Sequence, residues 1–179
     1  QSTHQEERRN TNALTISLIS GIVFTIVAAV AGYIGYSENG VRGLFGFGLT
    51  GTVAIAAFIG TFLCRRGRSS QGIGVLIGTI FVLALTIPFI VHGQGLALGI
   101  LVAIVVAGIS SATLPTASAT RAIIGGFTIA IIITITDLYL PDLGLPTDAT
   151  TANTIAGVTA LLYIISILWR YNTYGLRTK

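Results

Sequence analysis

The chain has 179 residues, of which 53% are hydrophobic and 9% charged, and its formal net charge is +4. Soluble domains are about 25% charged, so a chain this poor in charge argues against a water-facing globular domain. The basic residues gather at the ends of apolar runs, which indicates orientation in a membrane and argues against nucleic-acid binding. The single cysteine, Cys64, excludes a disulfide within the chain.

Six apolar runs follow one another along the chain, separated by short polar breaks. A helix needs about 20 apolar residues to cross a bilayer, and the runs approach or exceed that length. The predicted helices are 13–36, 43–63, 72–91, 96–114, 122–140 and 154–169. We therefore expect an all-α fold, a bundle of six transmembrane helices arranged as three hairpins, over residues 13–171.

Polar segments flank the predicted bundle at both ends. Residues 1–12 carry four charges and lead directly into the first apolar run, so we expect a mobile cytoplasmic tail and no signal peptide. Residues 172–179 form a second cytoplasmic tail, which is basic. Residues 110–120, rich in serine, threonine and alanine, are predicted as a loop, and Pro88 is expected to kink or end the third helix.

The basic residues predict which side of the membrane each loop occupies. Lysine and arginine are retained on the cytoplasmic side, and with both termini inside, nine of the ten basic residues lie there while Arg42 lies outside. We expect an integral protein of a bacterial-type inner (plasma) membrane, with anionic lipid headgroups meeting its cytoplasmic face. The principal topology determinants are Arg65, Arg66, Arg68, Arg121 and Arg170.

Pairs of small residues four positions apart mark where helices can approach closely. Three pairs are predicted to serve helix packing: Ala28 with Gly32, Gly74 with Gly78, and Gly95 with Gly99. The threonine hydroxyls within the spans are expected to bond carbonyls of their own helices or to join neighbouring helices, rather than to line a transport path.

Three side chains are candidates for chemistry. Asp137 lies near the end of the fifth run, and an ionisable group within a span is a candidate ion or proton site; its closeness to the following loop also fits a carboxylate that reaches water. His92 is a candidate axial ligand for a pigment or haem, or a polar turn residue. Cys64 is a candidate for palmitoylation, or a small unmodified residue.

The segment Gly175-Leu176-Arg177-Thr178-Lys179 resembles the Leu-Arg-Thr-Lys stretch that borders a transmembrane helix in bacterial multi-span sensor histidine kinases. The resemblance implies a membrane input region, with signalling domains beyond residue 179. In this sequence the stretch follows the spans and does not precede one.

No metal-ligand set, catalytic triad or buried carboxylate pair is evident, so the sequence predicts a protein that is not an enzyme and uses no cofactor. We expect a non-catalytic membrane module, either an accessory or scaffolding subunit that contacts other membrane subunits or copies of itself, or the input region of a sensor. A small transporter or channel, and a pigment- or cofactor-binding protein that uses His92, are the alternatives.

Overall fold

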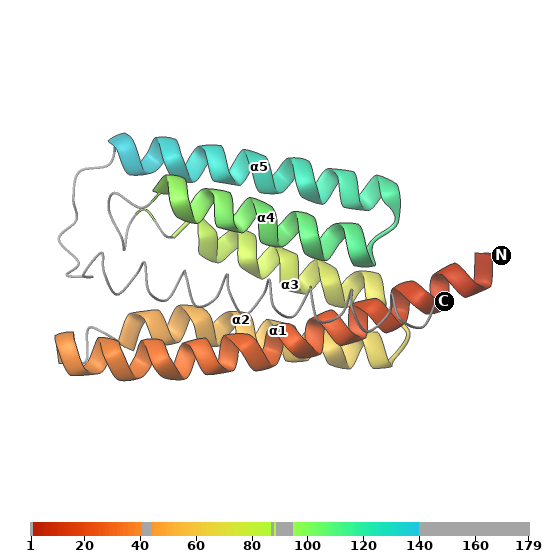
Figure 1. Cartoon of the computed structure of the whole chain (residues 1–179), viewed down its shortest axis with the longest axis horizontal. Coiled ribbons are helices and arrows are strands. Elements are labelled where there is room, and N and C mark those ends of the chain that lie inside the picture. The colour runs from red at the N-terminus through yellow and green to blue at the C-terminus, as the bar shows by residue number, and fades with distance from the viewer. Residues whose placement is uncertain (1, 41–43, 87, 89–94, 140–179) are drawn as a thin grey trace, which may run out of the picture.

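The computed structural model describes residues 2–40, 44–86, 88 and 95–139. Over these ranges the chain is all-α, as predicted, and its helices lie side by side along the long axis of the molecule (Figure 1). The five helices of the described ranges are α1 (Ser2–Asn39), α2 (Leu44–Arg65), α3 (Ser69–Ala84), α4 (Gly95–Thr113) and α5 (Thr116–Tyr139).

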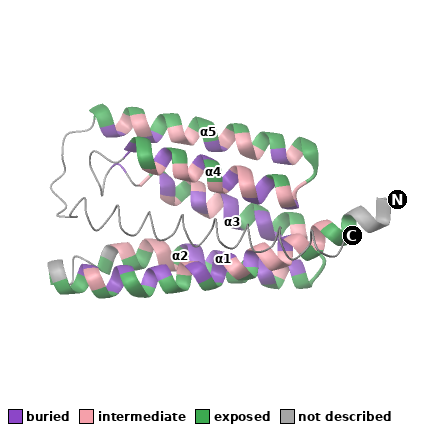
Figure 2. Cartoon of the chain, in the orientation of Figure 1, coloured by how far each residue is buried: buried purple, intermediate pink, exposed green. Residues whose placement is uncertain are grey.

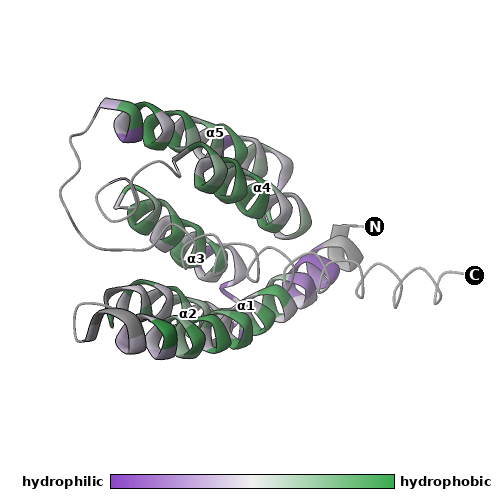
Figure 3. Ribbon diagram, turned by 60° about the vertical axis from the view of Figure 1, so that its left-hand side comes forward, coloured by the Kyte–Doolittle hydropathy of each residue, from purple (hydrophilic) through white to green (hydrophobic). Residues whose placement is uncertain are grey.

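Four of these helices are long and apolar enough to cross a membrane. The qualifying stretches are Glu6–Ser37, Gly46–Arg65, Gly95–Thr113 and Thr116–Tyr139. Hydrophobic residues cover the helices, and a hydrophilic stretch marks the start of α1 (Figure 3). This confirms the coarse prediction of membrane-compatible helices, whereas the sixth helix, 154–169, lies outside the described residues.

Helix α3 is shorter than the predicted span of 72–91. It has 16 residues and therefore rises about 24 Å, less than the about 30 Å of a hydrocarbon core. The helix ends at Ala84, and the Thr86 amide and hydroxyl both donate to the Leu83 carbonyl, at 3.0 and 2.6 Å. Pro88 follows closely. A proline ring disfavours helical dihedral angles at the residue before it, which fits the end of the helix ahead of Pro88.

Residues 110–120 do not form the predicted loop. Only Leu114 and Pro115 separate α4 from α5. The prediction was wrong because these polar side chains are satisfied inside the helix: Ser110 donates to the Val106 carbonyl at 2.6 Å and Thr113 to the Ile109 carbonyl at 2.6 Å. Residues 2–12, expected as a mobile tail, continue α1, and the Asn12 amide donates to the Ala112 carbonyl of α4 at 3.2 Å.

The core lies among α1, α2, α3 and α4, and exposed residues line the outer faces of the helices (Figure 2). Ile73, Leu76, Val106 and Ile109 are almost completely buried there. Large apolar side chains such as Ile22, Ile55 and Ile131 point outward. Helices that are apolar all round suit a lipid environment.

The turn between α2 and α3 has a Schellman geometry centred on Gly67. Gly67 has φ +77°, its N–H donates to the Cys64 carbonyl at 3.0 Å, and the Arg68 N–H donates to the Leu63 carbonyl at 2.9 Å. This pattern closes a helix and requires a residue that tolerates the left-handed region, which is the property of glycine. The turn therefore fixes the backbone between Arg66 and Arg68.

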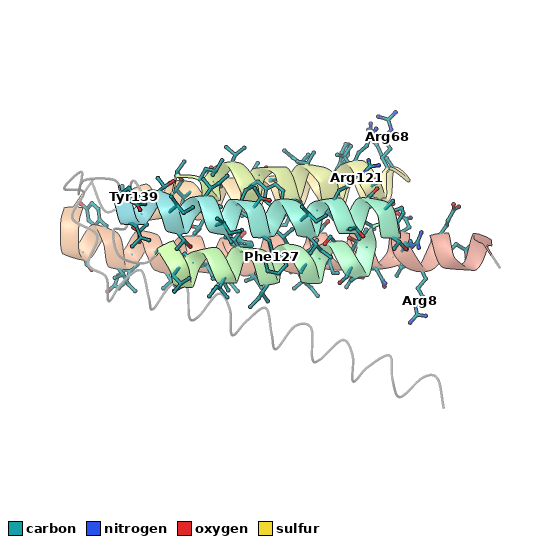
Figure 4. The ribbon with its side chains drawn as sticks, turned by 90° about the horizontal axis from the view of Figure 1, so that it is seen from above. Arg8, Arg68, Arg121, Phe127 and Tyr139 are labelled. Atoms are coloured by element: carbon teal, nitrogen blue, oxygen red, sulfur yellow. The ribbon has the colours of Figure 1, made fainter. Side chains whose placement is uncertain are left out.

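Described arginines from three separate parts of the chain lie at the same end of the molecule. Figure 4 places Arg8, Arg68 and Arg121 there and Tyr139 at the opposite end. We call the first of these the arginine end and the second the Asp137 end, because Asp137 lies in the last turn of α5.

Candidate functional site

Asp137 is the single charged side chain that is buried among the residues the structure describes. It is 7% exposed, and its Oδ2 accepts a hydrogen bond of 2.8 Å from the backbone N–H of Gly95. Gly95 is the first residue of α4. A carboxylate of α5 therefore caps the N-terminus of the neighbouring helix, where N–H groups lack partners within the helix.

A carboxylate at the N-terminus of a helix makes an electrostatically favourable contact. The N-terminus of a helix carries a partial positive charge, and a nearby anion stabilises it by about 0.3–1 kcal/mol, up to about 2 in partly buried geometries. A hydrogen bond to a charged group contributes about 1.5–3 kcal/mol. The contact joins α4 and α5 at the Asp137 end and gives the buried charge a structural partner.

Gly95 leaves the space that Asp137 occupies. A Cβ at position 95 would lie 2.5 Å from the Asp137 Cβ and 2.8 Å from its Oδ2. Real Cβ atoms do not come so close, so any larger residue at position 95 would push the carboxylate and the two helices apart. The absence of a side chain at position 95 is therefore part of the site.

The close approach continues from Gly95 toward the arginine end. A Cβ at Gly99 would lie 2.9 Å from the Ala130 carbonyl oxygen, and one at Gly126 would lie 3.3 Å from a Val106 methyl group. The structure thus places Gly95 and Gly99, which the sequence singled out, in one α4–α5 interface. Sequence reasoning did not find Gly126, although Gly126 and Ala130 have the same small-residue spacing of four.

The predicted pair Ala28 and Gly32 lies between α1 and α2. Ala28 is buried, and a Cβ at Gly32 would lie 3.2 Å from the Phe47 ring. Gly74 and Gly78 of α3 differ from these, because a Cβ at either would meet no described atom within 4 Å. Their backbone faces outward from the described bundle.

Gly60 and Gly72 form a contact that sequence reasoning missed. A Cβ at Gly72 would lie 2.6 Å from the Gly60 carbonyl oxygen and 3.1 Å from the Cys64 sulfur. Gly60 lies seven residues before Gly67 and Gly72 five residues after it, and the sharp turn brings the two glycines opposite each other. A glycine on each side of a tight turn is the sequence signal that could have identified them.

Cys64 and Ser17 lie beside this glycine contact. Cys64 is 1% exposed, and its Sγ lies 4.0 Å from the Ser69 carbonyl oxygen. A buried thiol in this position is shielded from an acyl donor. Ser17 is fully buried, and its side chain lies against the Cys64 thiol.

Many hydroxyl side chains in the described helices bond their own backbone. Thr50 donates to the Gly46 carbonyl, Thr61 to the Ala57 carbonyl and Thr134 to the Ala130 carbonyl, at 2.7, 2.9 and 2.9 Å. This confirms the expectation for these hydroxyls. These hydrogen bonds lie within single helices.

Two further predicted residues, His92 and Arg170, lie outside the described residues. In the described ranges, His, Cys, Asp and Glu form no group of three that could hold a metal ion. No protein-family model, curated protein or solved structure matches the chain. The class supported by the fold is that of an α-helical protein with several helices compatible with membrane insertion.

Proposed function

We propose that the chain is a non-catalytic multi-pass membrane module: a bundle of six transmembrane helices, with both termini in the cytoplasm, that serves as an accessory or scaffolding subunit of a larger membrane complex. The sixth helix is the apolar run 154–169. The plasma membrane, of the bacterial inner-membrane type, is the proposed location.

The observation that carries the proposal is an open small-residue face on α3. Gln71, Gly74, Val75, Gly78 and Val82 share one side of this helix by their spacing, and Gly74 and Gly78 meet no described side chain or backbone. Val82 is 65% exposed on the same side. A helix that approaches this face would contact the backbone of α3 at Gly74 and Gly78, with side chains only around these two glycines.

Such a face suits association with another helix inside a bilayer. Lipid tails are as apolar as the helices, so helix association there depends on close van der Waals packing and on weak polar contacts. Two glycines four residues apart allow the backbones of two helices to come close. Flexible lipid chains pack less closely against such a surface than a helix does. We therefore propose that this face, defined as Gly74, Gly78 and Val82, contacts a helix of a partner subunit.

The distribution of arginines supports the proposed orientation. The described arginines of α1, of the α2–α3 turn and of α5 lie at one end of the bundle (Figure 4). If that end is cytoplasmic, α1 begins inside, and the run 154–169 would return the chain to the same side. Reporter fusions after residues 40, 67, 92 and 115 test this orientation, and an alternation other than outside, inside, outside, inside contradicts it.

Purification under mild conditions tests the accessory role. Isolated from its own membranes, the wild-type chain is expected in an assembly heavier than its 18.6 kDa, with the same partner chain in repeated preparations. Replacing both Gly74 and Gly78 by leucine should release that partner, because the side chains fill the space the partner backbone needs. The matched control replaces Gly48 and Gly51 of α2 by leucine, where a Cβ also meets no described atom within 4 Å, and should retain the partner.

Two outcomes of that purification contradict the proposal. One is a wild-type chain isolated alone in every mild detergent. The other is a partner retained equally by the leucine variant of Gly74 and Gly78 and by the leucine variant of Gly48 and Gly51. A much heavier chain that contains this segment would instead favour the sensor input region implied by the resemblance of Gly175–Lys179.

Ion or proton transport is the second candidate function, and the burial of Asp137 favours it. A carboxylate within a span is by default a functional candidate. Asp137→Asn keeps the size of the side chain and a hydrogen-bond acceptor for Gly95. Retained ion or proton uptake in this variant, after reconstitution into vesicles, would exclude an essential role for the charge in transport.

A further inference from the structure

The arginine end contains an exposed guanidinium that is held against the lipid-facing side of a helix. The Arg66 guanidinium carbon lies 4.3 Å from the centroid of the Phe62 ring, and Phe62 is 53% exposed. An arginine is attracted to the face of an aromatic ring in this arrangement. Arg66 therefore turns back along α2 toward the membrane and does not extend into the solution.

An apolar stripe continues from this pair along α2. Ile55, Ile59, Phe62 and Arg66 follow at spacings of four, three and four residues, so they lie on one side of the helix. Both isoleucines are exposed, by 62% and 47%. Along this side of α2, a cation is followed by an aromatic ring and then by branched apolar side chains. A phospholipid has the complementary order, with an anionic phosphate followed by an apolar acyl chain.

The three arginines around the α2–α3 turn have no acidic partner among the described residues. Arg65 and Arg68 flank Arg66 and are also exposed, and the Schellman turn holds the backbone that joins them. Within the described part of the chain, no carboxylate forms an ion pair with Arg65, Arg66 or Arg68. Guanidinium groups bind phosphate through paired hydrogen bonds, so a phosphate-bearing ligand matches the charge and the donor groups.

We infer that Arg66 and Phe62 form a binding site for one anionic phospholipid, with its phosphate on Arg66 between Arg65 and Arg68 and an acyl chain along Ile59 and Ile55. We call it the Arg66–Phe62 site. It rests on the part of the proposed function that embeds α2 in a bilayer, and it goes beyond it by assigning a defined lipid class to a defined position.

A comparison with α5 separates a defined site from diffuse attraction between arginines and lipid. Helix α5 also carries an exposed arginine, Arg121, and an exposed aromatic residue, Phe127. The two are six residues apart, and Figure 4 shows Phe127 well along the helix from the arginine end. General charge attraction predicts equal effects at Arg66 and Arg121 and no effect at either phenylalanine.

The test is lipid binding to the full-length chain, purified in detergent and titrated with dioleoyl phosphatidylglycerol or dioleoyl phosphatidylcholine while bound lipid is counted by native mass spectrometry. We expect the wild type to retain one phosphatidylglycerol preferentially. Arg66→Gln should weaken its retention about fivefold, and Phe62→Leu, which changes no charge, about two- to fivefold. The matched control, Phe127→Leu, should leave retention unchanged.

Equal retention by Phe62→Leu and Phe127→Leu would overturn the inference, and so would equal weakening by Arg66→Gln and Arg121→Gln. Displacement of the bound lipid by millimolar inorganic phosphate would also overturn it, because the acyl chain would then contribute nothing. None of these results bears on the partner co-purification that tests the accessory role, so the two proposals fail separately.

Discussion

Replacing Gly95 by alanine is the most direct perturbation of the α4–α5 contact. The added methyl group would lie 2.5 Å from the Asp137 Cβ and 2.8 Å from its Oδ2. Neither neighbour is the far end of a long flexible side chain, so the helices have to separate or Asp137 has to leave the N-terminus of α4. Overpacking of this kind costs about 1–3 kcal/mol, and loss of the charged hydrogen bond would add about 1.5–3 kcal/mol.

Gly48→Ala provides the matched control for this substitution. Gly48 lies in α2, and a Cβ there would meet no described atom within 4 Å. Alanine in a helix interior is favoured over glycine by about 0.5–1 kcal/mol, so the control is expected to be neutral or slightly more stable. The difference between the two variants then isolates the contact with Asp137 from the intrinsic preference for alanine.

The assay is reversible unfolding in mixed micelles, followed by far-ultraviolet circular dichroism as the mole fraction of sodium dodecyl sulfate rises. We expect Gly95→Ala to lower the free energy of unfolding by at least about 1 kcal/mol relative to the wild type. If Gly95→Ala proves as stable as Gly48→Ala, the close approach of α4 and α5 at Asp137 is refuted.

Three further predictions concern the cap and the α2–α3 turn, with unfolding measured in the same way for the first two. Asp137→Asn should cost about 0.3–1 kcal/mol through loss of the charge and Asp137→Ala about 1.5–3 kcal/mol through loss of the hydrogen bond as well; equal stability of the two variants would contradict the capping role. Gly67→Ala should cost about 1–2 kcal/mol because φ at this position is +77°, and an unchanged midpoint would contradict the turn geometry. Cys64, which is 1% exposed, should react with N-ethylmaleimide only after unfolding, as followed by intact mass; rapid labelling of the folded protein would contradict its burial.

Local properties of the sequence were enough to predict the class of the fold. Hydropathy and length act on each segment separately, so they identified the apolar helices and the polar turns between them without knowledge of how the helices meet. Pro88 was informative for the same reason, since backbone restriction takes effect where the residue lies, whereas the orientation indicated by the arginine cluster stays a prediction. Residues 110–120 were mispredicted because serine and threonine, polar by composition, bond to carbonyls of their own helix.

Only the tertiary structure decided which faces of the helices meet. A soluble helix shows its packing side as a stripe of apolar residues. These helices are apolar on all sides, so the apolar pattern does not indicate which side of each helix faces its neighbours. The capping of α4 by Asp137, the approach of Gly60 to Gly72 and the burial of Cys64 all depend on that rotation. The same is true of Gly95 and Gly74, which have similar sequence surroundings: Gly95 is packed against a carboxylate, whereas a Cβ at Gly74 would meet no described atom within 4 Å.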